Sequence, residues 1–93
     1  MKIFKWNVEK NEVLFNKRGI TFEEIVQKIE SGAKYIETDH PNSNKYPNQK
    51  IIVVEIEGYA YLVPCVINGS EYFLKTIIPS RKATKKYFGG QNG

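Results

Sequence analysis

Apolar residues recur at helical spacing in one stretch near the start of the chain. The positions that repeat three or four apart are Phe22, Ile25, Val26 and Ile29. Thr21 to Glu24, at the start of this pattern, forms a capping box, in which the threonine accepts a backbone hydrogen bond and the glutamate returns one. Ser31-Gly32 ends the pattern. The spacing predicts a helix over 22–30 with one buried face.

The residues before this helix predict two further elements. Polar and apolar residues alternate over 2–6, which indicates a short strand or an extended arm laid on a sheet. Asn7 is a suitable N-cap for a helix over 8–16, in which an asparagine, a leucine and a phenylalanine form a modest apolar face. The basic pair 17–18 and then Gly19 suit a helix C-terminus with a left-handed exit residue.

The period changes in the second half of the chain. Isoleucine, valine, tyrosine and phenylalanine dominate three runs, at 50–57, 59–67 and 71–78. Gly58 separates the first two runs, and Asn68-Gly69, a strong hairpin signal, separates the last two. The pattern predicts an antiparallel meander.

Two features around the meander are less regular. A short strand over 35–38 is followed by a polar loop over 40–49 that contains two prolines. Pro64 falls inside the middle strand, where it removes a ladder hydrogen bond. Either a bulge or a break in that strand would accommodate it.

The last meander strand leads into a basic segment. Pro79 interrupts the strand, and Ser80 is a good N-cap for a short helix. Ala83 and Tyr87 are four residues apart, so one helical face is expected to pack on the sheet. The remaining positions of this segment carry the cations Arg81, Lys82, Lys85 and Lys86, with no acid among them.

These elements predict an α+β fold. Two N-terminal helices pack on one face of a small antiparallel sheet, and a short basic helix ends the domain. A length of 93 residues suits a single domain, which we place at 1–88, followed by a flexible tail at 89–93.

The amino-acid composition says more about the kind of binding partner than about the fold. Lysine and arginine exceed aspartate and glutamate by 14 to 10, which favours an anionic partner, either nucleic acid or an acidic protein. Cys65 is the only cysteine and is expected to pack as a small hydrophobic residue. No apolar run is long enough for a membrane span, and no secretory signal is recognisable, so we expect a cytoplasmic protein with no membrane partner.

The basic segment is the first candidate site. A strand that ends in a cationic helix start is a natural seat for phosphate, so we select Arg81 first and Lys82 second as phosphate ligands. Lys85 and Lys86 are candidate RNA contacts, or simply a solvated face. No histidine, cysteine or acidic cluster has metal-ligand spacing, so neither a metal site nor a cofactor is expected.

Other candidates are weaker. Lys17 and Arg18 form a second basic pair, with Lys17 as an RNA contact, although both residues also suit a plain helix end. His40 is the only histidine and thus the only side chain that titrates near neutrality by default, but a lone loop histidine is usually just exposed. The acid and base of any reaction are not identified; His40 and Glu24 are the guesses.

Two stretches resemble a known family. Residues 4–24 run from Phe-Lys-Trp-Asn through Lys-Asn to Lys-Arg-Gly-Ile-Thr-Phe-Glu-Glu, and 78–87 read Ile-Pro-Ser-Arg-Lys-Ala-Thr-Lys-Lys-Tyr. These resemble the opening of BrnT-type toxins (aromatic-x-Trp-Asp, Lys-Asn, Lys-His-Gly-Ile-Ser-Phe-Glu-Glu) and their Ser-Ala-Arg-Lys-Ala-Thr ending. The matching stretches cover about a third of the chain.

The resemblance implies the toxin of a type II toxin–antitoxin pair, with a RelE-like fold and a ribonuclease activity that arrests translation. The implied substrate is mRNA, free or on the ribosome. The implied partner is a cognate antitoxin, through which alone operator DNA is bound. The chain departs from the pattern at Asn7, where the family has aspartate, at Arg18, where it has histidine, and in a longer loop after His40.

Two alternatives to a toxin ribonuclease stay open. The loss of the family histidine at Arg18 motivates a non-catalytic binding module of the same fold, which retains antitoxin or nucleic-acid binding. The excess of cations also fits a general nucleic-acid binder, whose affinity falls steeply with salt.

Overall fold

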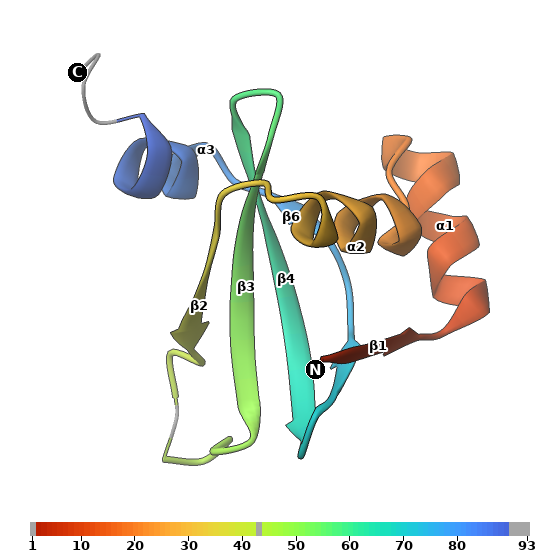
Figure 1. Cartoon of the computed structure of the whole chain (residues 1–93), viewed down its shortest axis with the longest axis vertical. Helices are drawn as coiled ribbons and strands as arrows, with labels where there is room; N and C mark the ends of the chain where they lie inside the picture. Colours follow the sequence, from red (N-terminus) through yellow and green to blue (C-terminus); the bar gives the residue numbers. More distant parts are fainter. Residues whose placement is uncertain (1, 43, 90–93) are drawn as a thin grey trace.

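Six strands form one sheet, and helices lie on both sides of it (Figure 1). The computed structural model describes residues 2–42 and 44–89, so most of the predicted tail at 89–93 lies outside the described residues. The elements in chain order are β1 Ile3–Trp6, α1 Val8–Arg18, α2 Phe22–Glu30, β2 Tyr35–Asp39, β3 Gln49–Ile56, β4 Tyr59–Asn68, β5 Glu71–Leu74, β6 Ile78–Pro79, α3 Arg81–Ala83 and a π-helical turn, η1, Thr84–Phe88. The fold class is α+β, as predicted.

The strand order corrects one part of the prediction. The sheet runs β1-β5-β4-β3-β2, with β6 paired to β4. Strands β2 to β5 pair antiparallel, as the meander pattern predicted. The first strand pairs parallel to β5, with Ile3 opposite Glu71 and Trp6 opposite Leu74. The sheet is therefore mixed, and the prediction of a purely antiparallel sheet is wrong.

The predicted caps of both N-terminal helices are confirmed. The Asn7 side chain accepts a hydrogen bond from the backbone N–H of Lys10 at 2.9 Å. The Thr21 hydroxyl accepts one from the N–H of Glu24 at 3.2 Å. Gly19 is left-handed at φ 68° and its N–H donates to the last turn of α1. These local signals set the helix boundaries, although α1 continues to Arg18, beyond the predicted residue 16.

Polar contacts hold α1 in place. Leu14 is buried, whereas Phe15, predicted on the same apolar face, is 58% exposed. The Asn11 side chain accepts from the N–H of Phe22 at 2.7 Å and donates to the Glu23 carboxylate at 2.6 Å. One asparagine therefore joins the two helices where apolar burial is small.

Pro64 in β4 is accommodated by a bulge in the adjacent strand, between β5 and β6. Cys65 pairs with Leu74, and Leu62 pairs with Ile78. The two positions are three residues apart in β4 but four apart in the paired segment, which therefore contains one extra residue. The Pro64 carbonyl accepts from the N–H of Lys75 at 2.8 Å, so the N–H that proline lacks would face this same interrupted side. The predicted strand over 71–78 is consequently broken into β5 and β6.

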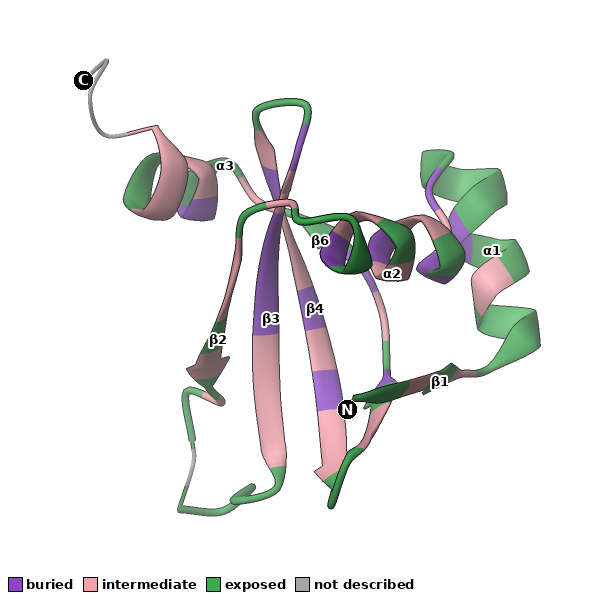
Figure 2. Cartoon of the chain, in the orientation of Figure 1, coloured by how far each residue is buried: buried purple, intermediate pink, exposed green. Residues whose placement is uncertain are grey.

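Each face of the sheet has its own cluster of buried side chains, because successive residues of a strand alternate sides. The larger cluster lies under α1 and α2 and comprises Leu14, Ile20, Phe22, Ile25, Ile29, Ile52, Val54, Ile56, Val63, Cys65, Leu74 and Ile77. Figure 2 shows this burial where α2 meets β3 and β4. We call this side of the sheet the helix face.

The opposite side, which we call the open face, is covered only in part. Its buried residues are Val53, Ala60 and Ala83, with Ile36, Ile51, Leu62, Tyr87 and Phe88 packed against them. The segment of α3 and η1 supplies the covering side chains, as the spacing of Ala83 and Tyr87 predicted. Only the first three residues of this segment are α-helical, and the rest form the π-helical turn.

In the described part of the chain, no helix has the length and apolar character needed to cross a membrane.

Candidate functional site

A groove runs between the open face and the C-terminal segment. Its cavity volume is about 530 Å³. The floor is apolar and formed by strand residues, while the C-terminal segment contributes two lysines and a tyrosine to its wall. The lining residues are Thr38, Asp39, Pro41, Ile51, Val53, Leu62, Ser80, Lys82, Ala83, Lys86 and Tyr87. We call this hollow the basic groove.

The C-terminal wall of the groove is attached to β4 through one residue. The backbone N–H of Ser80 donates to the Ala60 carbonyl at 3.0 Å. The Thr84 hydroxyl accepts from the Ala60 N–H at 2.8 Å and donates to the Ser80 carbonyl at 2.8 Å. The Ser80 hydroxyl in turn caps the segment by accepting from Ala83 N–H at 3.0 Å. Both backbone groups of Ala60 thus fix where the basic segment lies.

The structure divides the four predicted cations of this segment into two pairs. Lys82 and Lys86 line the basic groove. The Lys86 ammonium lies 5.2 Å from the centroid of the Tyr87 ring. Arg81 and Lys85 are exposed and are not among the groove residues. Within residues 2–42 and 44–89, none of the four forms an ion pair, so all retain their charge for an external anion.

The groove has one carboxylate, and it is already partnered. The Lys50 ammonium lies 2.7 Å from an Asp39 carboxylate oxygen. The hydrogen bond from Lys50, reinforced by its charge, lowers the pKa of Asp39 and raises the pKa of Lys50 above their ordinary values. Asp39 therefore stays ionised at neutral pH and is a weak proton acceptor.

His40 is near the groove but does not line it. Its Nδ1 accepts from the Asn42 N–H at 3.0 Å, and its ring lies 4.9 Å from that of Tyr46. Its chain neighbours Asp39 and Pro41 are groove residues. The imidazole therefore packs on its own loop, and its Nε2 is not used in these contacts.

Arg18 has a structural contact that the sequence did not reveal. One guanidinium nitrogen, Nη1, donates to the Ile77 carbonyl at 2.6 Å. Ile77 lies in the bulge between β5 and β6, where the strand ladder is interrupted. Arg18 therefore ties the end of α1 to the strand that precedes the basic segment. Its neighbour Lys17 is exposed on α1, away from the groove residues.

We expect Arg18→Ala to lower the free energy of unfolding by about 1 kcal/mol, because it removes a charge-assisted hydrogen bond to a bulge carbonyl. Urea denaturation followed by Trp6 fluorescence measures this loss. Lys17→Ala is the matched control in the same helical turn and should stay within about 0.5 kcal/mol of the unmodified chain. Unchanged stability of Arg18→Ala together with lost RNA affinity would show instead that Arg18 acts at the site.

Glu24 and Cys65 lie away from the groove, and Cys65 packs in the core as the sequence predicted. Glu24, a guess for the acid or base, is half-buried in α2 on the helix face. Cys65 is buried, and this burial raises the pKa of its thiol to about 11. The thiol is therefore protonated at neutral pH and is a poor nucleophile.

The sequence analysis did not predict the apolar groove floor or the Thr84 hydroxyl that attaches the basic segment to Ala60. Ile51, Val53 and Leu62 were counted as strand residues without assignment to a face, although their alternation with Ile52 and Val63 carries that information. Thr84 gave no signal, because its partner Ala60 is remote in the sequence.

Among the side chains that the structure describes, no three from histidine, cysteine, aspartate and glutamate gather closely enough to hold a metal ion. None of the protein-family models, characterised proteins or solved structures compared with the chain matches it.

Proposed function

We propose that this chain is the toxin of a type II toxin–antitoxin pair, a RelE-like endoribonuclease that cleaves mRNA at the basic groove. The observation that carries the proposal is the pairing of Lys82 and Lys86 over an apolar floor on an otherwise open sheet face. The residues of this wall belong to the stretch that resembles the BrnT-type ending. The α+β arrangement, with two N-terminal helices and a basic C-terminal segment, is compatible with the RelE-like fold that the resemblance implies.

RNA cleavage by the ribose 2′-OH needs cationic side chains but no metal ion. The ribose 2′-OH attacks the adjacent phosphorus, its proton passes to a base, and the leaving 5′-oxygen receives a proton from an acid. Negative charge builds on the non-bridging phosphate oxygens as the 2′-oxygen adds to phosphorus, and it moves to the 5′-oxygen as that bond breaks and leaves a 2′,3′-cyclic phosphate. The ammonium groups of Lys82 and Lys86 are our candidates for neutralising that charge.

Proton transfer needs an acid and a base near the scissile phosphate. Tyr87 lines the groove and carries a hydroxyl, and His40 lies between two groove residues, Asp39 and Pro41, in the chain. These two groups are our candidates for the acid and the base. Arg81 is our candidate for an additional phosphate ligand, because its exposed guanidinium begins the same segment.

Two engaged side chains favour the alternative of a binding module that does not cleave RNA. The one groove carboxylate is held by Lys50, and Arg18, which stands at the position of the family histidine, donates to Ile77. Such a module would bind RNA or antitoxin through the same lysines without cleaving RNA.

Induction of the chain in cells, with growth and RNA integrity followed together, tests the proposal. We expect growth arrest and fragmented mRNA, and fragments from purified chain and RNA without added metal. Arg81→Ala should weaken both effects; if arrest is unaffected, Arg81 is not a site residue. Normal growth with intact RNA, together with RNA binding by the purified chain, would favour the binding module.

A further inference from the structure

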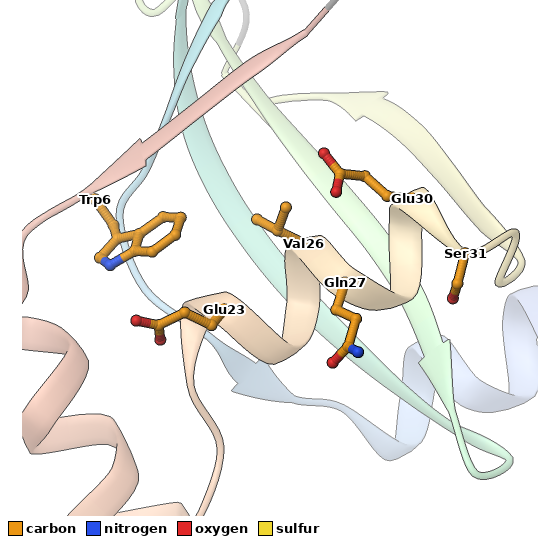
Figure 3. A pocket seen from close by; sticks show the side chains of 6 residues that line it. All are labelled: Trp6, Glu23, Val26, Gln27, Glu30 and Ser31. Carbon is orange, nitrogen blue, oxygen red and sulfur yellow. The ribbon is translucent and has the colours of Figure 1, made fainter.

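A second surface lies on the helix layer, on β1 and α2. Figure 3 shows Trp6, from β1, facing α2 across a hollow. The cavity volume is about 380 Å³, and α2 contributes Glu23, Val26 and Glu30 to its lining. Trp6 stacks on the buried Phe22 with ring centroids 5.8 Å apart, which fixes the indole at the edge of this hollow. The half-buried Trp6 and Val26 give it an apolar floor between two carboxylates.

The hollow continues along α1. A neighbouring cavity of about 520 Å³ is lined by Glu12, Phe15 and Glu23 among others, so Glu23 belongs to both. Phe15 is 58% exposed, so its ring adds apolar area next to these carboxylates. We call the combined region the acidic surface, comprising Trp6, Glu12, Phe15, Glu23, Val26 and Glu30.

The three carboxylates of this surface carry uncompensated charge. Glu12, Glu23 and Glu30 are exposed, and the ion pairs formed within residues 2–42 and 44–89 include none of them. They are gathered on a chain whose net charge is +4. Glu23 and Glu30 are seven residues apart in one helix, which separates them by about 10.5 Å along its axis.

We infer that the acidic surface binds a basic amphipathic helix of a partner protein. Its apolar stripe would lie over Trp6, Val26 and Phe15, in the manner of a helix that lays its apolar face into a groove. Cationic side chains on its two flanks would reach the carboxylates, with spacings of about two helical turns matching Glu23 and Glu30. Among the described residues, the cationic side chains that line the basic groove have no counterpart in the lining of either hollow, so the surface suits a different partner from the basic groove.

A designed peptide probes the surface directly. It has about 18 residues, with leucines on one face at helical spacing and lysines on the flanks. Trp6 is the only tryptophan, so its emission reports occupancy without a label. We expect the emission to change on titration and the affinity to fall as salt rises. A peptide with glutamate in place of every lysine should leave the emission unchanged.

Two variants assign the binding to the carboxylates. Glu23→Gln combined with Glu30→Gln should weaken peptide binding about tenfold or more, by loss of two charge pairs. Because Glu23 also accepts from Asn11, Glu12→Gln with Glu30→Gln is a second variant that leaves this helix contact intact. The matched control is Glu55→Gln with Glu57→Gln at the β3–β4 hairpin, which removes the same charge and should bind unchanged.

Four results would overturn the inference. Unchanged affinity in both carboxylate variants, or equal loss in the hairpin control, would show that the acidic surface does not hold the peptide. Equal binding of the glutamate peptide would show that charge plays no part. A Trp6 emission change that depends on protein concentration alone, with a matching increase in sedimentation mass, would identify a second copy of this chain as the occupant.

Discussion

Replacing Thr84 with valine is expected to lower the free energy of unfolding by about 1–3 kcal/mol and to weaken RNA binding with it. The hydroxyl accepts from the N–H of Ala60, a residue with no exposed surface, so valine leaves a buried donor without a partner. It also loses its bond to the Ser80 carbonyl. Since these contacts attach the basic segment to β4, Lys82 and Lys86 lose their fixed position over the groove.

Thr84→Ser is the control, because it keeps the hydroxyl while removing only a methyl group. Urea denaturation gives the free energy of unfolding of each variant, and RNA titration under native conditions gives the affinity. The serine variant should retain both properties. If the valine variant unfolds at the same urea concentration as the unmodified chain, the Thr84 hydroxyl contributes nothing to stability, and the segment is held by the Ser80–Ala60 hydrogen bond and by the packing of Ala83 and Tyr87.

The locally determined parts of the fold were predictable from sequence. Asn7, Thr21 and Ser80 were each predicted as N-caps, and each accepts a hydrogen bond from a backbone N–H three residues later. A cap acts within one helical turn, so the residues that decide it are adjacent in the sequence. Gly19 ended α1 for the same local reason.

Long-range pairing was not predictable in the same way. Nothing in the alternation of 2–6 indicates which strand it joins or in which direction, and β1 proved to lie parallel to β5. Pro64 signalled an irregularity, but the bulge formed opposite it, around Ile77. A missing donor restricts the neighbouring strand as much as its own, and one sequence does not identify that neighbour.

The candidate site was likewise predictable only where the deciding residues are close in the sequence. The basic character of the C-terminal segment was evident, and the spacing of Ala83 and Tyr87 gave its packed face. Whether Lys85 or Lys86 faces the groove depends on how η1 winds after Ala83, and the π-helical turn brings Lys86 to it. Arg81 and Lys82 precede this turn, and of these two only Lys82 lines the groove. The role of Arg18 was hidden, because its acceptor is a backbone carbonyl 59 residues away.

The two surfaces carry opposite charge, and this separation has a consequence for binding. Lysines line the groove on the open face, while unpaired carboxylates gather over α1 and α2. The helices α1 and α2 also carry the cations Lys10, Lys17, Arg18 and Lys28. Their side is therefore close to neutral as a whole, whereas the C-terminal segment carries cations with no acid among them. An anionic polymer is therefore attracted more strongly to the groove side, and it is oriented before contact. A net charge alone would not provide this orientation, which is why the position of each lysine matters for RNA binding.

Replacing Lys82 and Lys86 together with alanine is accordingly expected to reduce the affinity for single-stranded RNA about 30-fold, from roughly 1 kcal/mol per lost phosphate contact. The slope of log affinity against log salt should become shallower by about 1.4, because two fewer counterions are released from single-stranded RNA. Fluorescence anisotropy of a labelled oligonucleotide at several salt concentrations measures both quantities. The groove variant should remain folded, since neither lysine makes an ion pair with another described residue.

The matched control is Lys10→Ala with Lys28→Ala, which removes the same charge from α1 and α2. If the groove holds the phosphates, the control changes affinity and salt slope far less than the groove variant does. Equal losses in the two variants would mean that RNA responds to total charge, as for a general nucleic-acid binder. Full affinity in the groove variant would place the RNA elsewhere, because a phosphate bound by two ammonium groups cannot lose both without weaker binding.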